Sequence, residues 1–199
     1  MRVWPLYPLL ASYLIGSIPF GVILGKRLAG VDVRQFGSGN IGAANVLRTL
    51  GFPFAAATGI LDAAKGVAAA LLARWAGASP GWTVSLGIAA VAGHDWTPFL
   101  GFRGGKGIAT TFGFLLVAAP RAALAFSIIW GLVLLLSRYV SLASIVASAT
   151  IPVICLALRL PAEFVLGTAV LGAMAVWRHR SNIGRLLSGQ EYKIGEKAK

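Results

Sequence analysis

Acidic side chains are scarce in this 199-residue chain, which has 6 Asp and Glu against 18 Lys and Arg. Only 12% of its residues are charged, about half of the fraction that is typical of soluble domains. A hydrophobic fraction of 57% and a mean hydropathy of +0.79 are too high for a globule that faces water on every side. They also exclude disorder, which requires low hydrophobicity. The composition therefore excludes a soluble enzyme and indicates an integral membrane protein.

Cysteine is almost absent, and the one cysteine, Cys155, lies in an apolar run. A single cysteine excludes an internal disulfide and a cysteine-based metal site. The six acids are scattered along the chain and form no sequence cluster for a divalent cation. This argues against membrane alcohol phosphotransferases, which need several aspartates on facing helices. We therefore expect no metal and no other cofactor.

What the sequence does contain is a series of long stretches with few or no charges. Residues 3–25, 75–94 and 139–158 carry none, and each is long enough to cross a hydrocarbon core of about 30 Å as a helix. The predicted spans are about 4–25, 52–74, 80–98, 106–119, 121–137, 141–158 and 161–178. The predicted fold class is therefore an all-α integral membrane protein with seven transmembrane helices.

Two of these predicted spans are unusual. Span 106–119 ends at Pro120 and would cover only about 21 Å as a helix, so it must borrow length from its flanks or lie in thinned bilayer. The first span is interrupted by Gly16, Pro19 and Gly21. It is also too long for a cleaved signal peptide and lacks an A-x-A-type end, so we expect it to stay in the protein.

The positive residues are distributed unequally between the two sides that seven spans would create. One side consists of loops 26–50, 99–106 and 138–140 and the segment from Arg178 onward. It holds thirteen Lys and Arg, against four on the other side. The positive-inside rule then places the N-terminus outside and the C-terminus in the cytoplasm.

The expected organisation is a single membrane-embedded domain over residues 1–199 that ends in a short polar cytoplasmic tail, 188–199. We expect a multi-pass protein of the cell (inner) membrane. Its net charge of +12 is explained by topology and by attraction to anionic lipid. No nucleic-acid partner is expected, because no basic soluble domain is present to bind one.

The first loop on the positive side, residues 37–48, reads GSGNIGAANVLR. It has the G-x-G-x-x-G spacing but lacks the β/α alternation of a dinucleotide-binding fold, which is therefore not favoured. Glycines allow close backbone approach, and amides beside a helix start bind anions. Arg48 adds a planar fork that suits phosphate. The segment is either a phosphate-binding loop or a glycine-rich turn with polar caps.

The second loop, residues 93–107, reads GHDWTPFLGFRGGKG. It lacks the Walker A spacing, so nucleotide hydrolysis is not indicated. Lys106 lies between glycines where a helix is expected to begin, which combines a point charge with exposed amides and the positive end of the helix dipole. His94 and Asp95 are adjacent and project in different directions. We expect them to form a span terminus held by hydrogen bonds, not an acid–base pair.

The third segment, residues 177–186, reads WRHRSNIGRL. His179 and Asn182 are three residues apart and share one face of a helix. The histidine is a candidate acid, base or neutral donor to phosphate. The alternative is a solvated basic helix that leaves the membrane.

Asp62 and Lys65 lie three residues apart inside a predicted span. An unpaired charge in lipid costs at least about 2.5–3.5 kcal/mol, so we expect the two side chains to pair and to face the bundle. Both a functional site and an interhelical tie remain open for them.

Even numbers of predicted spans separate the three polar segments, so we expect all three on one membrane face. Together they form a glycine-lined, cationic surface with few carboxylates at the lipid boundary. No nucleophilic serine with a histidine–carboxylate relay can be assigned. Residue chemistry alone thus leads to phosphate binding beside lipid.

These motifs resemble those of the bacterial acyl-phosphate:glycerol-3-phosphate acyltransferases, which are membrane-integral enzymes. The similarity rests, in order, on residues 37–48, Asp62-x-x-Lys65-Gly66, residues 93–107, and His179-x-x-Asn182-Ile183-x-Arg185-Leu186. It extends over nearly the whole chain. Ala44, where threonine is common, and Gln190 before Glu191 depart from the family pattern without removing a phosphate-binding group.

The resemblance implies transfer of a fatty acyl group from acyl phosphate to the 1-hydroxyl of glycerol 3-phosphate, which gives lysophosphatidate and phosphate. It implies acyl phosphate, glycerol 3-phosphate and membrane lipid as partners, and we expect a monomer. The implied catalytic residues are Ser38, Arg48, Lys106, His179 and Asn182. The implied substrate- and phosphate-binding residues are Gly37, Gly39, Asn40, Asn45, Gly104, Gly105, Gly107 and Ser141.

Two mechanisms fit this assignment. In the first, the hydroxyl attacks directly and the donor's phosphate accepts its proton. In the second, His179 acts as general base. A function of another class also remains, a small transporter or flippase for phosphorylated lipid precursors, since broken helices are typical of transporters. The clustering of the motifs on one face and the lack of an internal repeat argue against it.

Overall fold

A computed structural model describes residues 6–196 of the chain, and every regular element in this part is a helix. The elements are α1 Tyr7–Ser17, α2 Phe20–Ala29, η1 Val33–Gln35, α3 Ala43–Leu50, α4 Phe52–Trp75, α5 Pro80–Asp95, η2 Pro98–Leu100, α6 Ile108–Ala118, α7 Pro120–Ser137, α8 Val140–Ala157, α9 Ala162–Arg178 and α10 Arg180–Leu187. The all-α prediction is therefore confirmed.

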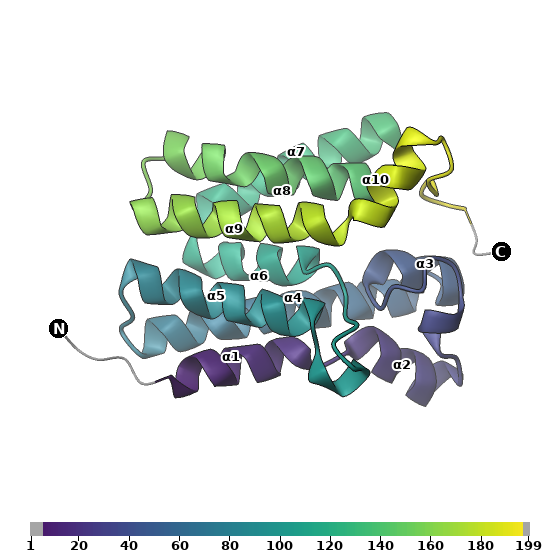
Figure 1. Cartoon of the computed structure of the whole chain (residues 1–199), viewed down its shortest axis with the longest axis horizontal. Helices are drawn as coiled ribbons and strands as arrows, with labels where there is room; N and C mark the ends of the chain where they lie inside the picture. Colours follow the sequence, from purple (N-terminus) through teal and green to yellow (C-terminus); the bar gives the residue numbers. More distant parts are fainter. Residues whose placement is uncertain (1–5, 197–199) are drawn as a thin grey trace.

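The long helices run side by side, and α1 and α2 follow one another in a single row (Figure 1). The most extensive contacts join α4 to α6, α1 to α5 and α8 to α9. The short helices α3 and α10 lie with α2 at one end of the bundle, on the right in Figure 1, while α1 begins at the opposite end. This brings residues from the beginning and the end of the chain together.

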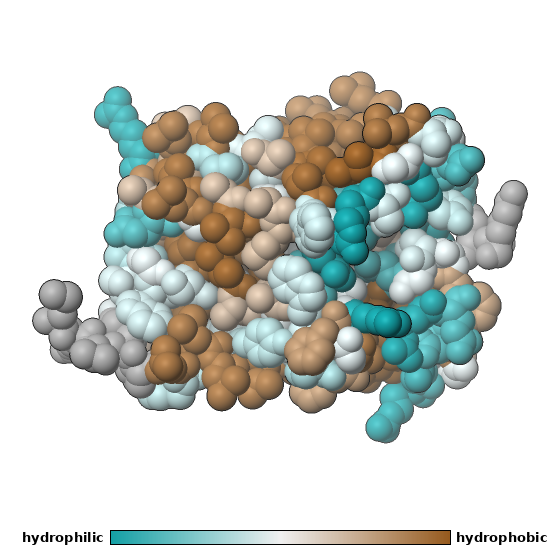
Figure 2. All heavy atoms as spheres, in the orientation of Figure 1, coloured by the Kyte–Doolittle hydropathy of each residue, from teal (hydrophilic) through white to brown (hydrophobic). Residues whose placement is uncertain are grey.

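Helices coincide with the seven predicted spans to within a few residues, and within residues 6–196 four stretches are long and apolar enough to cross a membrane. These are Tyr7–Ala29, Phe52–Trp75, Pro120–Ser137 and Val140–Ala157. Hydrophobic side chains gather along the helices, and hydrophilic ones are concentrated at the end that holds α2, α3 and α10 (Figure 2). The chain is thus a multi-pass membrane protein. Helix α6 has 11 residues and is shorter than predicted, with a length of about 17 Å.

The first span breaks between α1 and α2, at the predicted Pro19, and the break exposes backbone carbonyls inside the bundle. The Nζ atom of Lys65 donates to the carbonyls of Gly16 (3.1 Å) and Ile18 (2.8 Å), and lies 2.7 Å from Oδ1 of Asp62. The predicted pairing is therefore confirmed, and it ties α4 to the broken helix. Thr97 completes the arrangement, since its hydroxyl donates to the Ser17 carbonyl at 2.6 Å.

Glycine allows helices α1 and α5 to pack so closely that their backbones are in contact. A Cβ atom at Gly16 would lie 2.0 Å from the carbonyl oxygen of Ala90, and one at Gly93 would lie 2.0 Å from that of Tyr13. Such close contacts are typical of helices packed in membranes. They fix the end of α5 and hence the loop that leads to Lys106.

Candidate functional site

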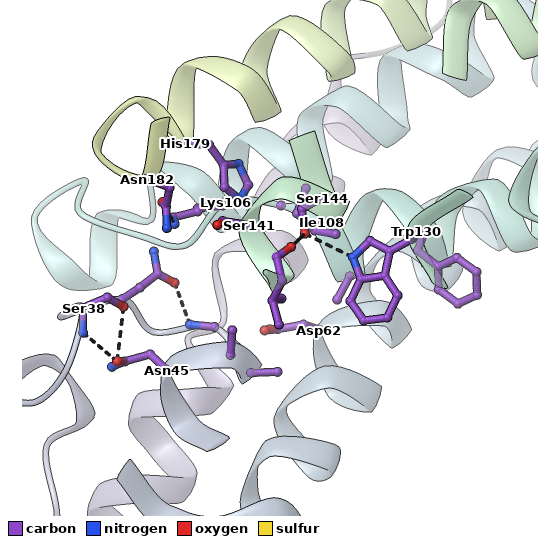
Figure 3. Close-up of a pocket in the computed structure, with 18 of the residues that line it drawn as sticks. Ser38, Asn45, Asp62, Lys106, Ile108, Trp130, Ser141, Ser144, His179 and Asn182 are labelled. Atoms are coloured by element: carbon purple, nitrogen blue, oxygen red, sulfur yellow. Dashed lines mark hydrogen bonds between the residues drawn. The ribbon is translucent and has the colours of Figure 1, made fainter. Parts of the chain in front are cut away.

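A cavity of about 490 Å³ opens at the end of the bundle where the three predicted segments meet. Helices α3, α6, α7, α8 and α10, the loop before α3 and the segment after α10 all contribute to its wall. The sequence-predicted residues that line it are Ser38, Asn40, Asn45, Arg48, Lys106, Gly107, Ser141, His179 and Asn182. In Figure 3, Lys106, Ser141, His179 and Asn182 lie close together, across the pocket from Ser38 and Asn45.

Asn45 organises the loop before α3. Its buried side-chain oxygen accepts hydrogen bonds from the backbone N–H of Ser38 (2.9 Å) and from the Ser38 hydroxyl (3.2 Å). Its amide nitrogen donates to the carbonyl of Val33 at 2.8 Å. Asn40 accepts from the N–H of Gly42 at 2.8 Å. Both asparagines thus shape the loop, and Ser38 lies at the pocket wall as a result.

The glycines predicted to bind phosphate differ in whether they line the cavity. Gly37 and Gly39 have φ of 58° and 67° and form the turns of the first loop, outside the cavity wall. Gly107, with φ of 69°, lines the cavity where α6 begins. Left-handed backbone of this kind favours glycine at all three positions.

Gly104 and Gly105 were expected to offer amides to phosphate, and their contacts differ from that expectation. Their N–H groups donate to the carbonyls of Asp95 (3.1 Å) and His94 (2.9 Å), and their carbonyls accept from Arg178. A Cβ atom at Gly105 would lie 1.9 Å from Nε2 of His94. Neither glycine lines the cavity. They hold the loop against the end of α5, as expected for His94 and Asp95 at a span terminus.

A line of hydrogen bonds connects Lys106 to the segment after α10. Lys106 donates to the side-chain oxygen of Asn182, whose amide nitrogen donates to Oε1 of Glu191 at 2.9 Å. Arg185 donates to the other carboxylate oxygen of Glu191 at 2.8 Å. Glu191 therefore fixes the Asn182 amide with its oxygen toward Lys106.

Sequence reasoning missed Glu191 as a residue of the site. It is 6% exposed and lines the cavity, although it lies in the segment expected to be a polar tail. It follows the last helix, so helical spacing gives no indication of its contacts. Its one signal is that it is an acid in a segment rich in cations.

Lys106 stands in surroundings that favour its neutral form. Burial in the pocket lowers its pKa to about 8, and the nearby guanidinium groups of Arg185, Arg48 and Arg178 add to the effect, while Glu191 opposes it. The amine is still mostly charged at neutral pH. A bound anion would favour that charge further.

His179 is buried, and its Nδ1 atom lies 2.7 Å from the carbonyl oxygen of Ala175. A carbonyl only accepts, so Nδ1 carries the proton and Nε2 keeps its lone pair. Burial and the charge of Lys106 lower the pKa of the ring to about 4, so it is neutral at pH 7. Because Nδ1 is bonded to main chain and not to a carboxylate, His179 is not part of a serine–histidine–carboxylate relay. In this segment His179 and Asn182 are buried, whereas Arg180 and Ser181 are exposed, so only its cavity-facing side departs from the solvated basic helix that was the alternative.

Ser141 lies in the first turn of α8, as its position predicted, and it lines the cavity. Within residues 6–196 this buried oxygen has no hydrogen-bond partner. A buried hydroxyl without a partner is costly, and a ligand oxygen in the pocket would supply one.

The part of the cavity wall that α6 and α7 supply is apolar. Phe112, Phe126 and Trp130 line it, and Trp130 is fixed by a hydrogen bond from its indole N–H to the hydroxyl of Ser144 at 3.2 Å (Figure 3). These residues were not predicted, because aromatic residues in apolar spans are indistinguishable from core by sequence. The cavity thus joins a cationic, hydrogen-bonding region to an aromatic one.

A smaller cavity of about 190 Å³ adjoins the first and shares Ser38, Asn40 and Lys106 with it. Its other lining residues are Arg178, Arg180, Ser181 and Arg185. Four cations around this volume favour an anion. In the described part of the chain, no group of three or more His, Cys, Asp and Glu is arranged to hold a metal ion.

Known proteins resemble this chain over nearly its full length. Residues 6–189 match the glycerol-3-phosphate acyltransferase family. Glycerol-3-phosphate acyltransferases of Rubrobacter xylanophilus and Agrobacterium fabrum are each 48% identical to it; both alignments cover 94% of this chain, and 93% and 91% of those proteins.

Crystal structures of an integral membrane glycerol 3-phosphate acyltransferase have the same fold. Its glycerol 3-phosphate form superposes with a TM-score of 0.91 at 39% identity, covering 96% of this chain and 95% of that one. Its lysophosphatidic acid form gives a TM-score of 0.88 at 38% identity, with the same coverage. The conserved length, the fold and the assembled pocket agree, and the chain belongs to the glycerol-3-phosphate acyltransferase family.

Proposed function

We propose that this acyltransferase transfers a fatty acyl group from acyl phosphate to the 1-hydroxyl of sn-glycerol 3-phosphate. The products are lysophosphatidate and phosphate, and the reaction is the first step of bacterial phospholipid synthesis. The observation that carries the proposal is one cavity with cations at one part of its wall and aromatic rings at another. Acyl phosphate has this same division into an anionic head and an apolar chain. The glycerol 3-phosphate and lysophosphatidic acid forms of the similar enzyme support the acceptor and the product.

The polar residues divide the work of holding two phosphates. Arg48 and Lys106 neutralise the phosphate charge, and Ser38 and the unpartnered Ser141 hydroxyl donate to phosphate or carbonyl oxygens. Asn182 holds the Lys106 amine in place. No metal or cofactor takes part in the proposed reaction.

The reaction proceeds by direct attack. The 1-hydroxyl oxygen of the acceptor bonds to the acyl carbon, the bond from that carbon to the phosphate oxygen breaks, and the hydroxyl proton moves to the departing phosphate. Lys106 and Ser141 stabilise the negative charge that develops on the acyl oxygen. The free lone pair on Nε2 of His179 accepts a hydrogen bond from the 2-hydroxyl of the acceptor and so orients the acceptor, and the ring's pKa of about 4 makes it a weak base.

The proposed topology has seven crossings, with the N-terminus outside and the C-terminus in the cytoplasm. The start of α1 and helix α10 lie at opposite ends of the bundle (Figure 1), which agrees with an odd number of crossings. The cavity is at the end rich in positive side chains, and the positive-inside rule assigns that end to the cytoplasmic face of the inner membrane. In this proposal residues 1–199 act as one domain and the protein works as a monomer.

The test uses purified protein in detergent with palmitoyl phosphate and labelled glycerol 3-phosphate. We expect labelled lysophosphatidate from acyl phosphate, none from acyl thioesters, and loss of product in Lys106→Ala. Detergent solution excludes transport across a sealed membrane as the source of signal. Folded protein that forms no product from any donor would refute the proposal and favour the transporter instead.

A further inference from the structure

The segment after α10 is fixed across the rim of the cavity. Gln190 donates its backbone N–H to the carbonyl of Arg185 at 2.8 Å. Four residues later, the N–H of Ile194 donates to the carbonyl of Arg138 at 2.8 Å, and the Arg138 side chain donates back to the Ile194 carbonyl at 3.4 Å. Residues 190–194, called the strap below, therefore connect α10 to the turn between α7 and α8.

The strap places an aromatic ring against a cation of the pocket. Glu191 points inward to Asn182, and the next residue, Tyr192, lies with its ring centroid 4.9 Å from the guanidinium carbon of Arg48. Arg48 is in the last turn of α3, so this contact joins the end of the chain to the first loop.

Arg48 differs from Arg185 in how it is held. A hydrogen bond to Glu191 occupies an N–H of Arg185. In the part of the chain that the structure describes, the Arg48 guanidinium makes no hydrogen bond or ion pair, and the Tyr192 ring is its contact. The guanidinium carbon lies over the face of the ring, which is the arrangement of a cation–π contact. The five N–H donors of the guanidinium make no hydrogen bond to the described residues and are free for a ligand.

We propose that Tyr192 is a positioning residue that holds Arg48 through this cation–π contact, so that the Arg48 donors are ready for a substrate phosphate. The inference rests on the proposed function, which gives Arg48 a phosphate to bind. Arginine has many rotamers, and fixing them before the ligand arrives removes an entropic cost of binding. The strap keeps the ring in place through its anchors at Gln190 and Ile194.

The test compares Tyr192→Leu, which removes the ring, with Tyr192→Phe, which keeps it. We expect Tyr192→Leu to raise the KM for one phosphate substrate about twofold to fivefold, the range of an exposed cation–π contact. Its kcat should stay near that of the unaltered enzyme. Tyr192→Phe should retain the original KM. The matched control is Tyr7→Leu, the same substitution at a tyrosine that is 66% exposed at the other end of the bundle.

For each variant, steady-state rates are measured while the concentrations of palmitoyl phosphate and of glycerol 3-phosphate are varied in turn. Melting temperatures are measured in the same detergent. An unchanged KM in Tyr192→Leu, or an equal rise in Tyr192→Phe, overturns the inference. So does a loss confined to kcat. If Tyr192→Leu does not fold, Tyr192→Met takes its place. The variant Arg48→Ala separates the proposal that Arg48 binds phosphate from the proposal that Tyr192 positions it. If Arg48→Ala keeps full activity, the proposed function of Arg48 is refuted. If Arg48→Ala loses activity and Tyr192→Leu keeps a normal KM, only the role of Tyr192 is refuted.

Discussion

At the scale of single residues, the chemistry of this site depends on which side chains carry a proton. Lys106 and His179 lie in the same pocket, and burial lowers the pKa of both. The result is a charged amine beside a neutral imidazole at pH 7. The sequence predicts both residues, but it cannot predict these states, which depend on how far the fold removes each group from water.

The charge of Lys106 predicts a loss of efficiency in alkaline solution. With a pKa of about 8, the ammonium is present below that pH and is lost above it, so kcat/KM for glycerol 3-phosphate should fall as pH rises through about 8. Lys106→Arg keeps a cation at every accessible pH and should remove this fall, even if its absolute rate is lower. Initial rates between pH 6 and 10, expressed as the ratio of variant to parent, measure the effect. A parallel fall in both proteins would contradict it.

Replacing His179 distinguishes the two mechanisms. Glutamine accepts a hydrogen bond but does not take up a proton at these pH values. If His179 only orients the acceptor through its 2-hydroxyl, His179→Gln should lose about tenfold or less, the worth of a hydrogen bond. Its rate should be flat between about pH 5.5 and 7.5. A general base would lose 10²–10⁴-fold, by the usual range for such catalysis, and that result would assign the proton transfer to His179.

The residues that sequence reasoning assigned and those it missed differ in a physical way. Ser38, Arg48, Lys106, His179 and Asn182 belong to short local motifs, and all five line one cavity. Other residues enter the site through tertiary contacts alone, from a segment after the last helix or from apolar spans. Their sequence surroundings are those of an ordinary tail or core. These missed residues are Glu191, Tyr192, Phe112, Phe126 and Trp130.

Among the helices, the first span shows how a polar group stabilises an irregular element inside the bundle. Proline at position 19 cannot continue the helix, and the carbonyls it frees need donors. Lys65 supplies them while Asp62 balances its charge. The break was predictable from the proline and glycines in the sequence, whereas the identity of Lys65 as the donor to the broken helix required the structure. The short helix α3 was likewise absent from the prediction, since hydropathy detects only long apolar stretches, whereas a helix at α10 was expected from the spacing of His179 and Asn182.

Lys65→Met tests this arrangement. Methionine is similar in length, but it removes the donor to the Gly16 carbonyl and the ammonium that lies 2.7 Å from Asp62, which leaves His94 at 3.5 Å as the remaining partner of that carboxylate. Breaking a buried pair in this way costs about 3–5 kcal/mol, so we expect a much lower melting temperature in detergent and a poor yield of folded protein. The double variant with Asp62→Asn should recover part of the loss, because no unpaired charge remains. Equal melting temperatures for Lys65→Met and the parent would show that the pair does not stabilise the fold.

At the scale of the whole molecule, the cavity lies where the hydrophilic end of the bundle meets its apolar body (Figure 2). Its cations come from the short helices and loops at that end, and its aromatic residues from α6 and α7. This arrangement would let an acyl chain enter between helices while its phosphate stays near water. The side chains at the apolar part then determine how long a chain fits.

Trp130 is the residue to change, because its ring lines the apolar wall and the Ser144 hydroxyl holds it in one orientation. Trp130→Ala enlarges the space, so we expect the ratio of kcat/KM for an eighteen-carbon to a twelve-carbon acyl phosphate to rise severalfold, since each methylene in an apolar pocket contributes about 1 kcal/mol or more. The matched control is Trp177→Ala, at a tryptophan that is 61% exposed and should leave the ratio unchanged. Competition between the two donors in one reaction measures the ratio directly and cancels differences in active fraction. An unchanged ratio in folded Trp130→Ala would mean that the aromatic part of the cavity does not hold the acyl chain, and the chain would then have to leave the site along the lipid-facing surface.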